Sequence, residues 1–313
     1  MTDFDTSDEN FLLSRRTMLT GVGLTGVGLT GVGLTGAAIA GSSLLGTSPA
    51  FAAQLSREEG IPTDPAARIA MIRRMRLRTD PGIVYWWFRG RNYAQQGAKL
   101  TPLCELVFGA VMKVNPLADG SMELTSYELG FRTAPGTSER SDQLRNPLTG
   151  EMVDVPFVPV GPTTVRYTAN NDLIFDGKIG NTTFKAEHVP ELFYHMGDQI
   201  TFQQHTAADS ETPGLPARRL NDMTMITSPA REALDPRVHC ASATGYGTDL
   251  SDYARWWKMP AGMGTQCLRS VGRKETSYAG MPKDWVDMLA RVNPEGARDP
   301  AKLLTLKQEE YRN

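Results

Sequence analysis

Residues 83–88, Ile83-Val-Tyr-Trp-Trp-Phe88, decide the fold class. β-branched and aromatic side chains follow one another without a break, and the turn sequence Thr79-Asp80-Pro81-Gly82 stands directly before them. Such residues fit the pleated, half-buried surface of a β-strand. Strand alternation places Trp86 and Phe88 on one face, which suits a core, and the residues between them on the other face. We therefore predict a β-strand here.

Many similar short runs follow along the chain. Turn pairs such as Asn115-Pro116 and Asp176-Gly177 separate them, and strands at roughly 8–12-residue spacing are typical of antiparallel sandwiches and barrels. We predict a mainly β protein, an antiparallel β-barrel or sandwich, with one domain over residues 53–313 (core about 68–295). The further predicted strands are residues 103–114, 122–132, 152–160, 163–168, 173–179, 182–189, 192–196, 199–205, 222–227 and 266–271.

Helical patterns are few and short. The pair Asp64-Pro65 is a good N-cap and first-turn combination, so residues 64–78 are expected to form a helix or a helix that leads into a strand. Other helices are predicted near residues 229–234, 283–291 and 300–311. The last two would be short C-terminal helices.

Composition excludes several protein classes. The chain has 313 residues and a formal net charge of −2, with 22% charged and 40% hydrophobic residues. These values fit neither a disordered nor a membrane-embedded chain, and there is no basic excess of the kind that nucleic-acid-binding proteins carry. The three cysteines, Cys104, Cys240 and Cys267, form no Cys-x-x-Cys motif. We therefore expect three structural cysteines and no metal site.

The N-terminal segment resembles a twin-arginine export signal. Ser14-Arg15-Arg16 precedes the hydrophobic pair Met18-Leu19, and a weakly apolar stretch then runs to Leu45. Ala50-Phe51-Ala52 forms a small-x-small cleavage site, so we predict cleavage between Ala52 and Ala53. The segment implies passage through the twin-arginine translocase, a periplasmic or secreted protein and no stable membrane span after cleavage. An uncleaved tether is the alternative.

No cofactor can be assigned from the sequence. Tandem Leu-Thr-Gly-Val-Gly repeats between Leu19 and Gly33 match the spacing of a dinucleotide-binding fingerprint. That fingerprint requires a preceding strand, a following helix and a distal acid, none of which a signal core supplies. Twin-arginine export carries folded and often cofactor-loaded proteins, so a redox enzyme with a bound cofactor stays open as a third class of function.

The outer positions of the first strand are candidate ligand-binding residues. Strand alternation places five aromatic and basic side chains on one face, as in a pocket for an aromatic or anionic ligand. The alternative is an amphipathic strand whose arginines extend into water. The five residues are Tyr85, Trp87, Arg89, Arg91 and Tyr93.

Histidines are the candidate general bases. If Gly197-Asp198 forms a two-residue hairpin turn, His195 opposes Ile200 on the face of Phe202, and His205 lies on the other face. On a face that lines a cavity, His188 or His195 could accept a proton from a substrate. The alternative is a hydrogen-bonded core histidine.

A second aromatic segment, Asp252–Pro260, follows a glycine-rich stretch at Thr244–Gly247 that we interpret as a flexible loop. The segment could close over a cavity as a lid, with Trp257 in contact with the ligand. Packing over one end of the sheet is the alternative.

Several stretches together resemble domain-of-unknown-function family 1838, a largely bacterial group. The most distinctive is Asn146-Pro-Leu-Thr-Gly-Glu151. The resemblance covers about residues 68–295 and implies neither an activity nor a catalytic residue. The other resembling stretches are Trp86–Tyr93, Tyr127–Phe131, Val153–Val155, Trp257–Met259 and Gly272–Lys274.

Two functions from different classes remain open. In the first, an exported enzyme transforms a small aromatic or hydrophobic molecule by acid–base chemistry in a β-barrel cavity. His188 or His195 would act as the base, and Arg89 or Arg91 would hold an anionic group. In the second, the protein is a non-catalytic periplasmic ligand-binding or envelope protein that uses the same cavity.

Overall fold

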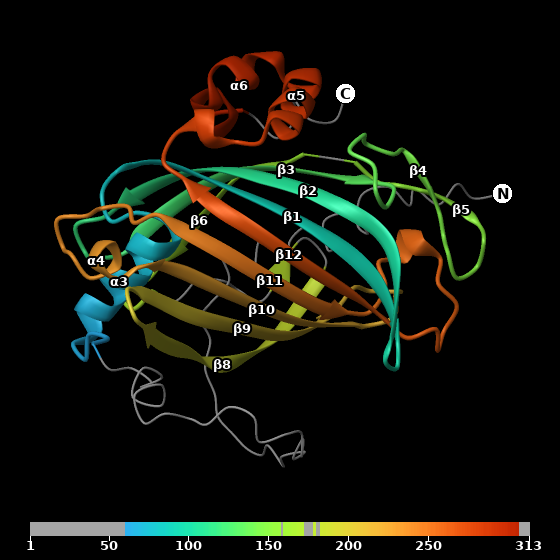
Figure 1. Cartoon of the computed structure of the whole chain (residues 1–313), viewed down its shortest axis with the longest axis horizontal. Helices are drawn as coiled ribbons and strands as arrows, with labels where there is room; N and C mark the ends of the chain where they lie inside the picture. The colour runs from blue at the N-terminus through green and yellow to red at the C-terminus, as the bar shows by residue number, and fades with distance from the viewer. Residues whose placement is uncertain (1–59, 158, 172–177, 180–181, 307–313) are drawn as a thin grey trace, which may run out of the picture.

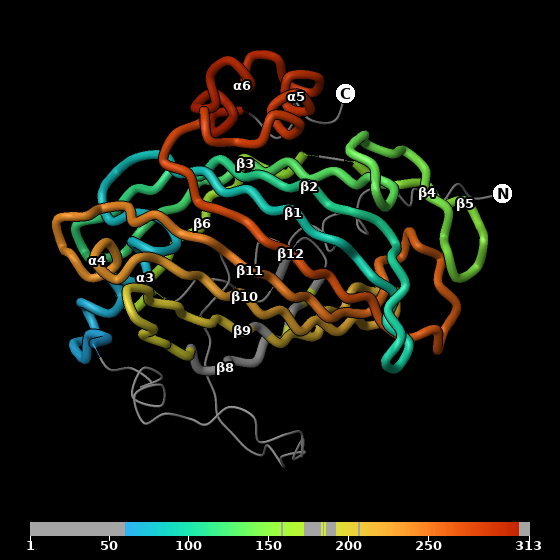
Figure 2. The backbone as a smooth tube through the Cα atoms, viewed as in Figure 1, coloured from blue at the N-terminus to red at the C-terminus, as the bar shows by residue number. Residues whose placement is uncertain are grey.

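The computed structural model describes residues 60–157, 159–171, 178–179 and 182–306. One ten-stranded antiparallel sheet dominates it, in the order β6-β3-β2-β1-β12-β11-β10-β9-β8-β7, and β4 and β5 form a separate two-stranded sheet. The large sheet curls, so that β6 lies behind the central strands in Figure 2. In the described strands β6 and β7 are its two edges, and no pairing joins them into a closed barrel.

The predicted mainly β, antiparallel class is confirmed. Besides the strands, the described residues form short helices: α3 (Pro65–Arg76), α4 (Ala230–Ala233), α5 (Lys283–Val292), α6 (Pro294–Arg298) and the 3₁₀ turns η1 (Arg255–Trp257), η2 (Tyr278–Gly280) and η3 (Pro300–Leu304). The strands are β1 (Gly82–Gln96), β2 (Lys99–Pro116), β3 (Met122–Thr133), β4 (Gln143–Arg145), β5 (Met152–Asp154), β6 (Val160–Tyr167), β7 (Lys178–Ile179), β8 (Thr182–Met196), β9 (Gln199–Glu211), β10 (Arg218–Pro229), β11 (Ala243–Ser251) and β12 (Thr265–Glu275).

The expected flexible loop at Thr244–Gly247 is wrong: these residues belong to β11, between β10 and β12 in the sheet. Aromatic packing explains why this strand contains glycine. A Cβ atom on Gly245 would lie 2.9 Å from the Phe88 ring, and one on Gly272 would lie 2.4 Å from the same ring. The two glycines therefore leave room for the Phe88 ring to lie flat on the sheet. Because β11 lacks the bulky residues that usually indicate a strand, its sequence resembles a loop.

The inner face of the sheet carries the main core. Trp86 and Phe88 stack with their ring centroids 5.4 Å apart, and both are buried as the alternation of residues 83–88 predicted. Helix α3 closes one end of this core with Met71 and Met75, which are fully buried. Its N-cap, Asp64, accepts a hydrogen bond from the Ala67 amide at 2.8 Å, which stabilises the first turn.

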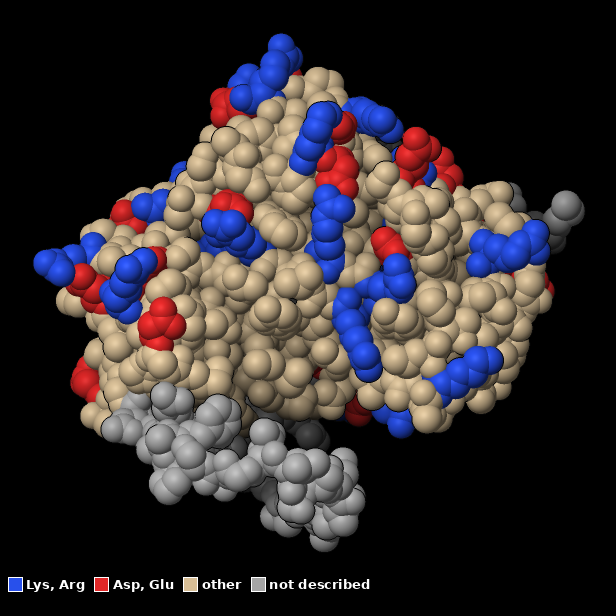
Figure 3. All heavy atoms as spheres, in the orientation of Figure 1, with Lys and Arg blue, Asp and Glu red and all other residues tan. Residues whose placement is uncertain are grey.

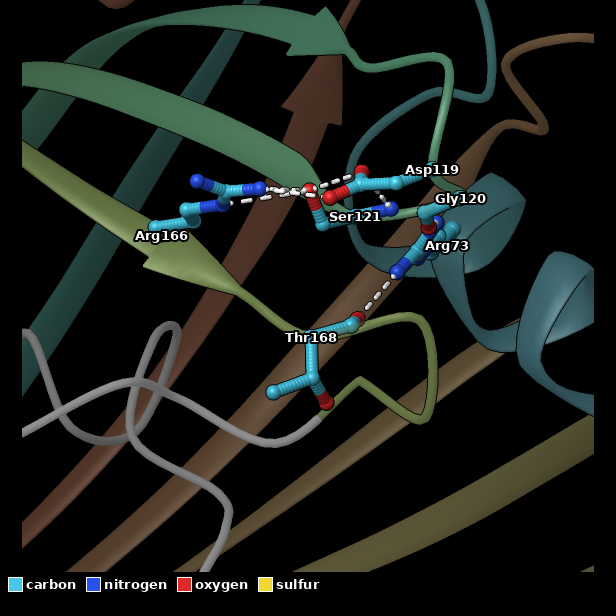
Figure 4. Close-up of polar contacts among 6 residues, drawn as sticks. All are labelled: Arg73, Asp119, Gly120, Ser121, Arg166 and Thr168. Atoms are coloured by element: carbon cyan, nitrogen blue, oxygen red, sulfur yellow. Dashed lines mark hydrogen bonds and ion pairs between the residues drawn. The ribbon is translucent and has the colours of Figure 1, made fainter.

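Arg73 fastens α3 to the edge of the sheet (Figure 4). Its guanidinium donates to the Thr168 carbonyl at 2.8 Å and to the Gly120 carbonyl at 3.0 Å. Beside it, Arg166 on β6 donates to Asp119 at 2.6 Å and to the Ser121 hydroxyl at 2.9 Å. The two arginines thus tie the β2–β3 turn to the segment that follows β6.

The C-terminal helices cover the outer face of β1–β3 (Figure 1). Trp285 of α5 is fully buried there, and its indole Nε1 donates to the Leu129 carbonyl at 2.9 Å. A Cβ atom on Gly109 would lie 2.4 Å from the Trp285 ring, so the glycine makes room for the indole. No helix among the described residues is long and apolar enough to cross a membrane.

Candidate functional site

Two aspartates face each other on the inner side of the sheet. Asp222 on β10 and Asp249 on β11 are direct antiparallel partners, and side chains at such positions start only about 5 Å apart. Each is 6% exposed. Like charges directly opposite one another destabilise a sheet, and burial adds to that penalty. A buried carboxyl pair is therefore an unusual feature that points to function rather than to stability.

Burial raises the pKa values of both carboxyl groups, and repulsion by the Asp249 charge adds to the shift at Asp222. Loss of solvation raises the pKa of Asp222 well above its usual value, and the neighbouring Asp249 charge raises it further. Loss of solvation also raises the pKa of Asp249, to about 6, against the opposing effects of the Ser251 hydroxyl and the Arg218 guanidinium. The pair titrates as a unit. Because Arg218 favours the ionised form of Asp249, Asp222 is the member of the pair that keeps a proton more readily.

A cavity of about 590 Å³ lies at the sheet rim, and neither Asp222 nor Asp249 is among the residues that line it. Ala208, Leu220 and Ser251 line it and are register partners across β9, β10 and β11, two residues along each strand from the row of the acid pair. Its volume falls in the range of small-molecule sites, which is roughly 300–1,000 Å³. The remaining lining residues are Lys185, Ala207, Asp209, Arg219, Asn221, Leu250, Asp252 and Thr265.

Charges of both signs surround the cavity. Lys185 pairs with Glu211 at 2.9 Å, and Arg219 lies 3.8 Å from Asp252. Asp252 also accepts a hydrogen bond from the Arg219 amide at 2.8 Å, which fixes the carboxylate at the rim. Leu220 and Leu250 supply the apolar part of the lining. The cavity therefore suits a molecule with both polar and apolar parts.

Several buried polar atoms near the acid pair have no hydrogen-bond partner among the described residues: Asp249 Oδ1, Asn92 Oδ1 and Arg218 Nε. Asp249 and Asn92 lie in one register row, with Leu268 between them. Buried polar groups normally have partners, so unpaired donors and acceptors in one part of the interior indicate a place where a polar ligand or water is bound. The adjacent row contains Gly247 and Ser270, whose small size leaves room above the sheet.

The far end of this polar row is closed by aromatic residues. The Asn92 amide donates to the Cys104 thiol at 3.8 Å, and the Arg132 guanidinium lies 5.2 Å from the Trp256 ring centroid. Trp256 stacks on Trp257, whose ring is 4.2 Å away and completely buried. Trp257, proposed from the sequence as a ligand contact on a lid, is thus a core residue over the sheet end. All three cysteines are free, and Cys240 is only half-buried.

The aromatic and basic face predicted on β1 lies on the outer side of the sheet, and none of its residues lines the cavity. Tyr85 is buried against Tyr278, with ring centroids 5.8 Å apart. Arg89 binds Asp284 at 2.8 Å and Arg91 pairs with Glu105. The Trp87 indole donates to Glu275 at 3.3 Å. Tyr93, opposite Cys267, is half-buried.

The histidines separate along β8. The predicted hairpin at Gly197-Asp198 is confirmed, because His195 pairs with Ile200. His195 lies at the apolar end of the strand, where a Cβ atom on Gly60 would approach its ring to 2.7 Å. His188 pairs with Thr206, which in turn pairs with Asp222, so its backbone lies in the row of the acid pair. The side chain of His188 is outside the described part of the structure.

The family comparison fits this architecture. A family model described as a protein of unknown function, DUF1838, matches residues 82–310, which span the sheet from β1 to the C-terminal helices. The chain belongs to the DUF1838 family. No curated protein matches the chain. The DUF1838 match thus confirms the family resemblance noted from the sequence and assigns no activity to it.

Sequence reasoning missed the acid pair of this DUF1838 protein. The alternation of Leu220, Asp222, Thr224 and Ile226 places an aspartate on the face of an apolar residue, and this was the available signal. Asp249 gave no such signal, because its glycine-rich segment resembles a loop. Among the described residues, no group of three or more His, Cys, Asp and Glu side chains could hold a metal ion.

Proposed function

We propose that the protein binds a small molecule at the rim cavity and transforms it by acid–base chemistry. The observation that carries this proposal is the Asp222–Asp249 pair: two carboxyl groups at directly opposed positions, both shielded from solvent and both with raised pKa values. Such a pair can donate one proton and accept another without a change in its own net charge. In this mechanism Asp222 and Asp249 take the acid–base role that the sequence suggested for His188 or His195. His188 remains a candidate through its register position.

The leucines of the cavity suit the aromatic or hydrophobic part of the ligand, and the charged rim suits its polar part. Asp249 is the proposed base, since its pKa of about 6 leaves it ionised at neutral pH. Asp222 is the proposed acid. Arg218 is a positioning residue, because its charge keeps the negative charge on Asp249.

Proton abstraction can be tested with a mixture of candidate substrates. The full chain is incubated in D₂O with a small-molecule extract of the expressing cells, and deuterium uptake by each metabolite is measured by mass spectrometry. We expect at least one metabolite to exchange, and Asp249→Asn to slow that exchange about a hundredfold or more, the usual contribution of a general base. Asp287→Asn, an exposed change on α5, is the matched control.

A metabolite that exchanges equally fast with wild type and Asp249→Asn would refute the acid–base assignment. The second candidate function, a non-catalytic carrier, predicts a different pattern. Native mass spectrometry would then show a bound small molecule that wild type retains and does not alter. The unpaired polar atoms of the interior favour bound ligand in either case.

We also propose export through the twin-arginine translocase to the periplasm or medium; the signal itself lies outside the described residues. Arg15→Lys with Arg16→Lys is expected to retain most of the protein in the cytoplasm. Exported wild-type protein should begin at Ala53, as shown by N-terminal sequencing. Arg57→Lys, beyond the cleavage site, is the control. Equal export of the double variant and wild type would contradict this route.

A further inference from the structure

The outer face of the central strands carries an apolar row with an arginine of β12 on either side of it. Val271 on β12, Tyr246 on β11 and Met225 on β10 are successive register partners, and Arg89 on β1 continues this row. Arg269 and Arg273 lie two residues to either side of Val271 on β12. We call Met225, Tyr246, Val271, Arg269 and Arg273 the outer patch.

The apolar side chains of the outer patch are unusually exposed. Tyr246 is 51% exposed and Val271 44%, and Leu250, two turns of the pleat from Tyr246 on the same strand, is 40% exposed. Tyr246 and Val271 are direct neighbours across the β11–β12 ladder, whereas Leu250 lies outside the patch, farther along β11. Contiguous exposed apolar surface commonly marks an interaction site. Figure 3 shows a line of basic side chains that runs down the middle of this view, with mostly uncharged surface on either side of its lower part.

Two arginines of this face repel each other across the sheet. Arg269 stands directly opposite Arg91 in the β1–β12 ladder, and like charges at such positions destabilise a sheet. Arg91 has Glu105, Arg89 has Asp284 and Arg273 has Glu275 as acidic partners, whereas Arg269 forms no ion pair within the described residues. An external anion would offset this repulsion.

We propose that the outer patch docks on a membrane surface that contains anionic phospholipids. Tyrosine and aliphatic side chains enter the headgroup boundary while arginines reach the phosphates, which is the pattern of interfacial binding. The face is the outer side of a curled sheet, and α5 and α6 cover only the neighbouring strands β1–β3 (Figure 1). A two-fold contact with a second copy through this patch would bring Arg269 and Arg273 close to their own copies, which charge repulsion disfavours.

This orientation also has a consequence for the rim cavity. Leu250 is exposed on the outer face and lines the cavity. Docking through the outer patch therefore brings the cavity close to the lipid headgroups, where amphipathic molecules gather. The docking itself does not depend on the proposed chemistry at Asp222 and Asp249.

Vesicle co-sedimentation tests the docking with the full chain. Vesicles of phosphatidylcholine alone are compared with vesicles that also contain phosphatidylglycerol, at low and high salt. We expect binding only with phosphatidylglycerol and a decrease with salt. Arg269→Ala should lower the partition coefficient about fivefold, and Tyr246→Ser with Val271→Ser should abolish the part of the sedimentation that depends on phosphatidylglycerol. Arg231→Ala and Met152→Ser are matched controls for an exposed arginine and an exposed apolar residue elsewhere.

All variants share the same N-terminal segment, so its contribution cancels in the comparison, and circular dichroism confirms that each variant is folded. Equal sedimentation of wild type and the Arg269 and Tyr246/Val271 variants would overturn the proposal. So would a dimer in sedimentation velocity that only the outer-patch variants dissociate, because the face would then be occupied by a second copy. Unchanged proton exchange in the Arg269 variant would separate this result from the chemistry of the acid pair.

Discussion

Asp249→Asn is expected to stabilise the protein by about 3 kcal/mol at pH 7, since a pKa raised from 3.8 to about 6 corresponds to two units at ~1.4 kcal/mol each. The sign follows from proton binding. Between about pH 4 and pH 6 the unfolded chain loses this proton while the folded protein keeps it, so wild-type stability falls as pH rises and is constant for this group above pH 6. Asparagine has no proton to lose.

The same substitution should also lower the pKa of Asp222, because the Asp249 charge is one cause of its elevation. The measurement is urea unfolding from pH 4 to pH 8 for wild type, Asp249→Asn and Asp287→Asn. We expect the free energy of unfolding to depend less on pH in Asp249→Asn than in wild type and Asp287→Asn. An infrared band of a protonated carboxylic acid at pH 7, lost in Asp222→Asn, would identify the proton directly. If the free energy of unfolding of Asp249→Asn changed with pH as it does in wild type, the raised pKa of Asp249 would be contradicted.

A gain in stability together with a loss of exchange activity would identify the pair as functional. Residues selected only for folding lose stability when they are replaced, whereas active-site residues often reduce stability in exchange for chemistry. A buried carboxyl pair without a function would have no reason to persist against this penalty.

Trp285→Ala is expected to cost about 3–5 kcal/mol, the range for a fully buried tryptophan. The change removes the indole that fills the space above Gly109 and leaves the Leu129 carbonyl without its donor. The outer face of β1–β3 would then lose the main contact with α5. Urea unfolding monitored by circular dichroism measures the difference, and Trp285→Phe should recover part of it.

Val292→Ala is the matched control on the same helix. Val292 is 37% exposed, so its truncation should change the free energy of unfolding by less than about 0.5 kcal/mol. A loss below about 1 kcal/mol for Trp285→Ala would show that the C-terminal helices contribute little to the stability of the sheet.

Local patterns in the sequence are enough to predict the fold class and most of the strands. Unbroken β-branched and aromatic runs such as residues 83–88 favour a sheet. The Gly197-Asp198 turn sets the β8–β9 register as far as Leu192, beyond which the pairing shifts by one residue. These features are local, since a side chain two residues away or a turn dipeptide is enough to determine them.

The site, in contrast, arises only from the tertiary arrangement. Asp222 and Asp249 lie on different strands with α4 and its loops between them, and no local pattern shows that their side chains face each other. β11 was missed for a related reason, because its Gly245 is explained by the Phe88 ring of a strand far away in the sequence. The same long-range pairing turned the arginines of β1 outward and placed them beside Val271 and Tyr246. Both the acid pair and the outer patch consist of residues that are distant in the sequence, and only strand pairing brings them together.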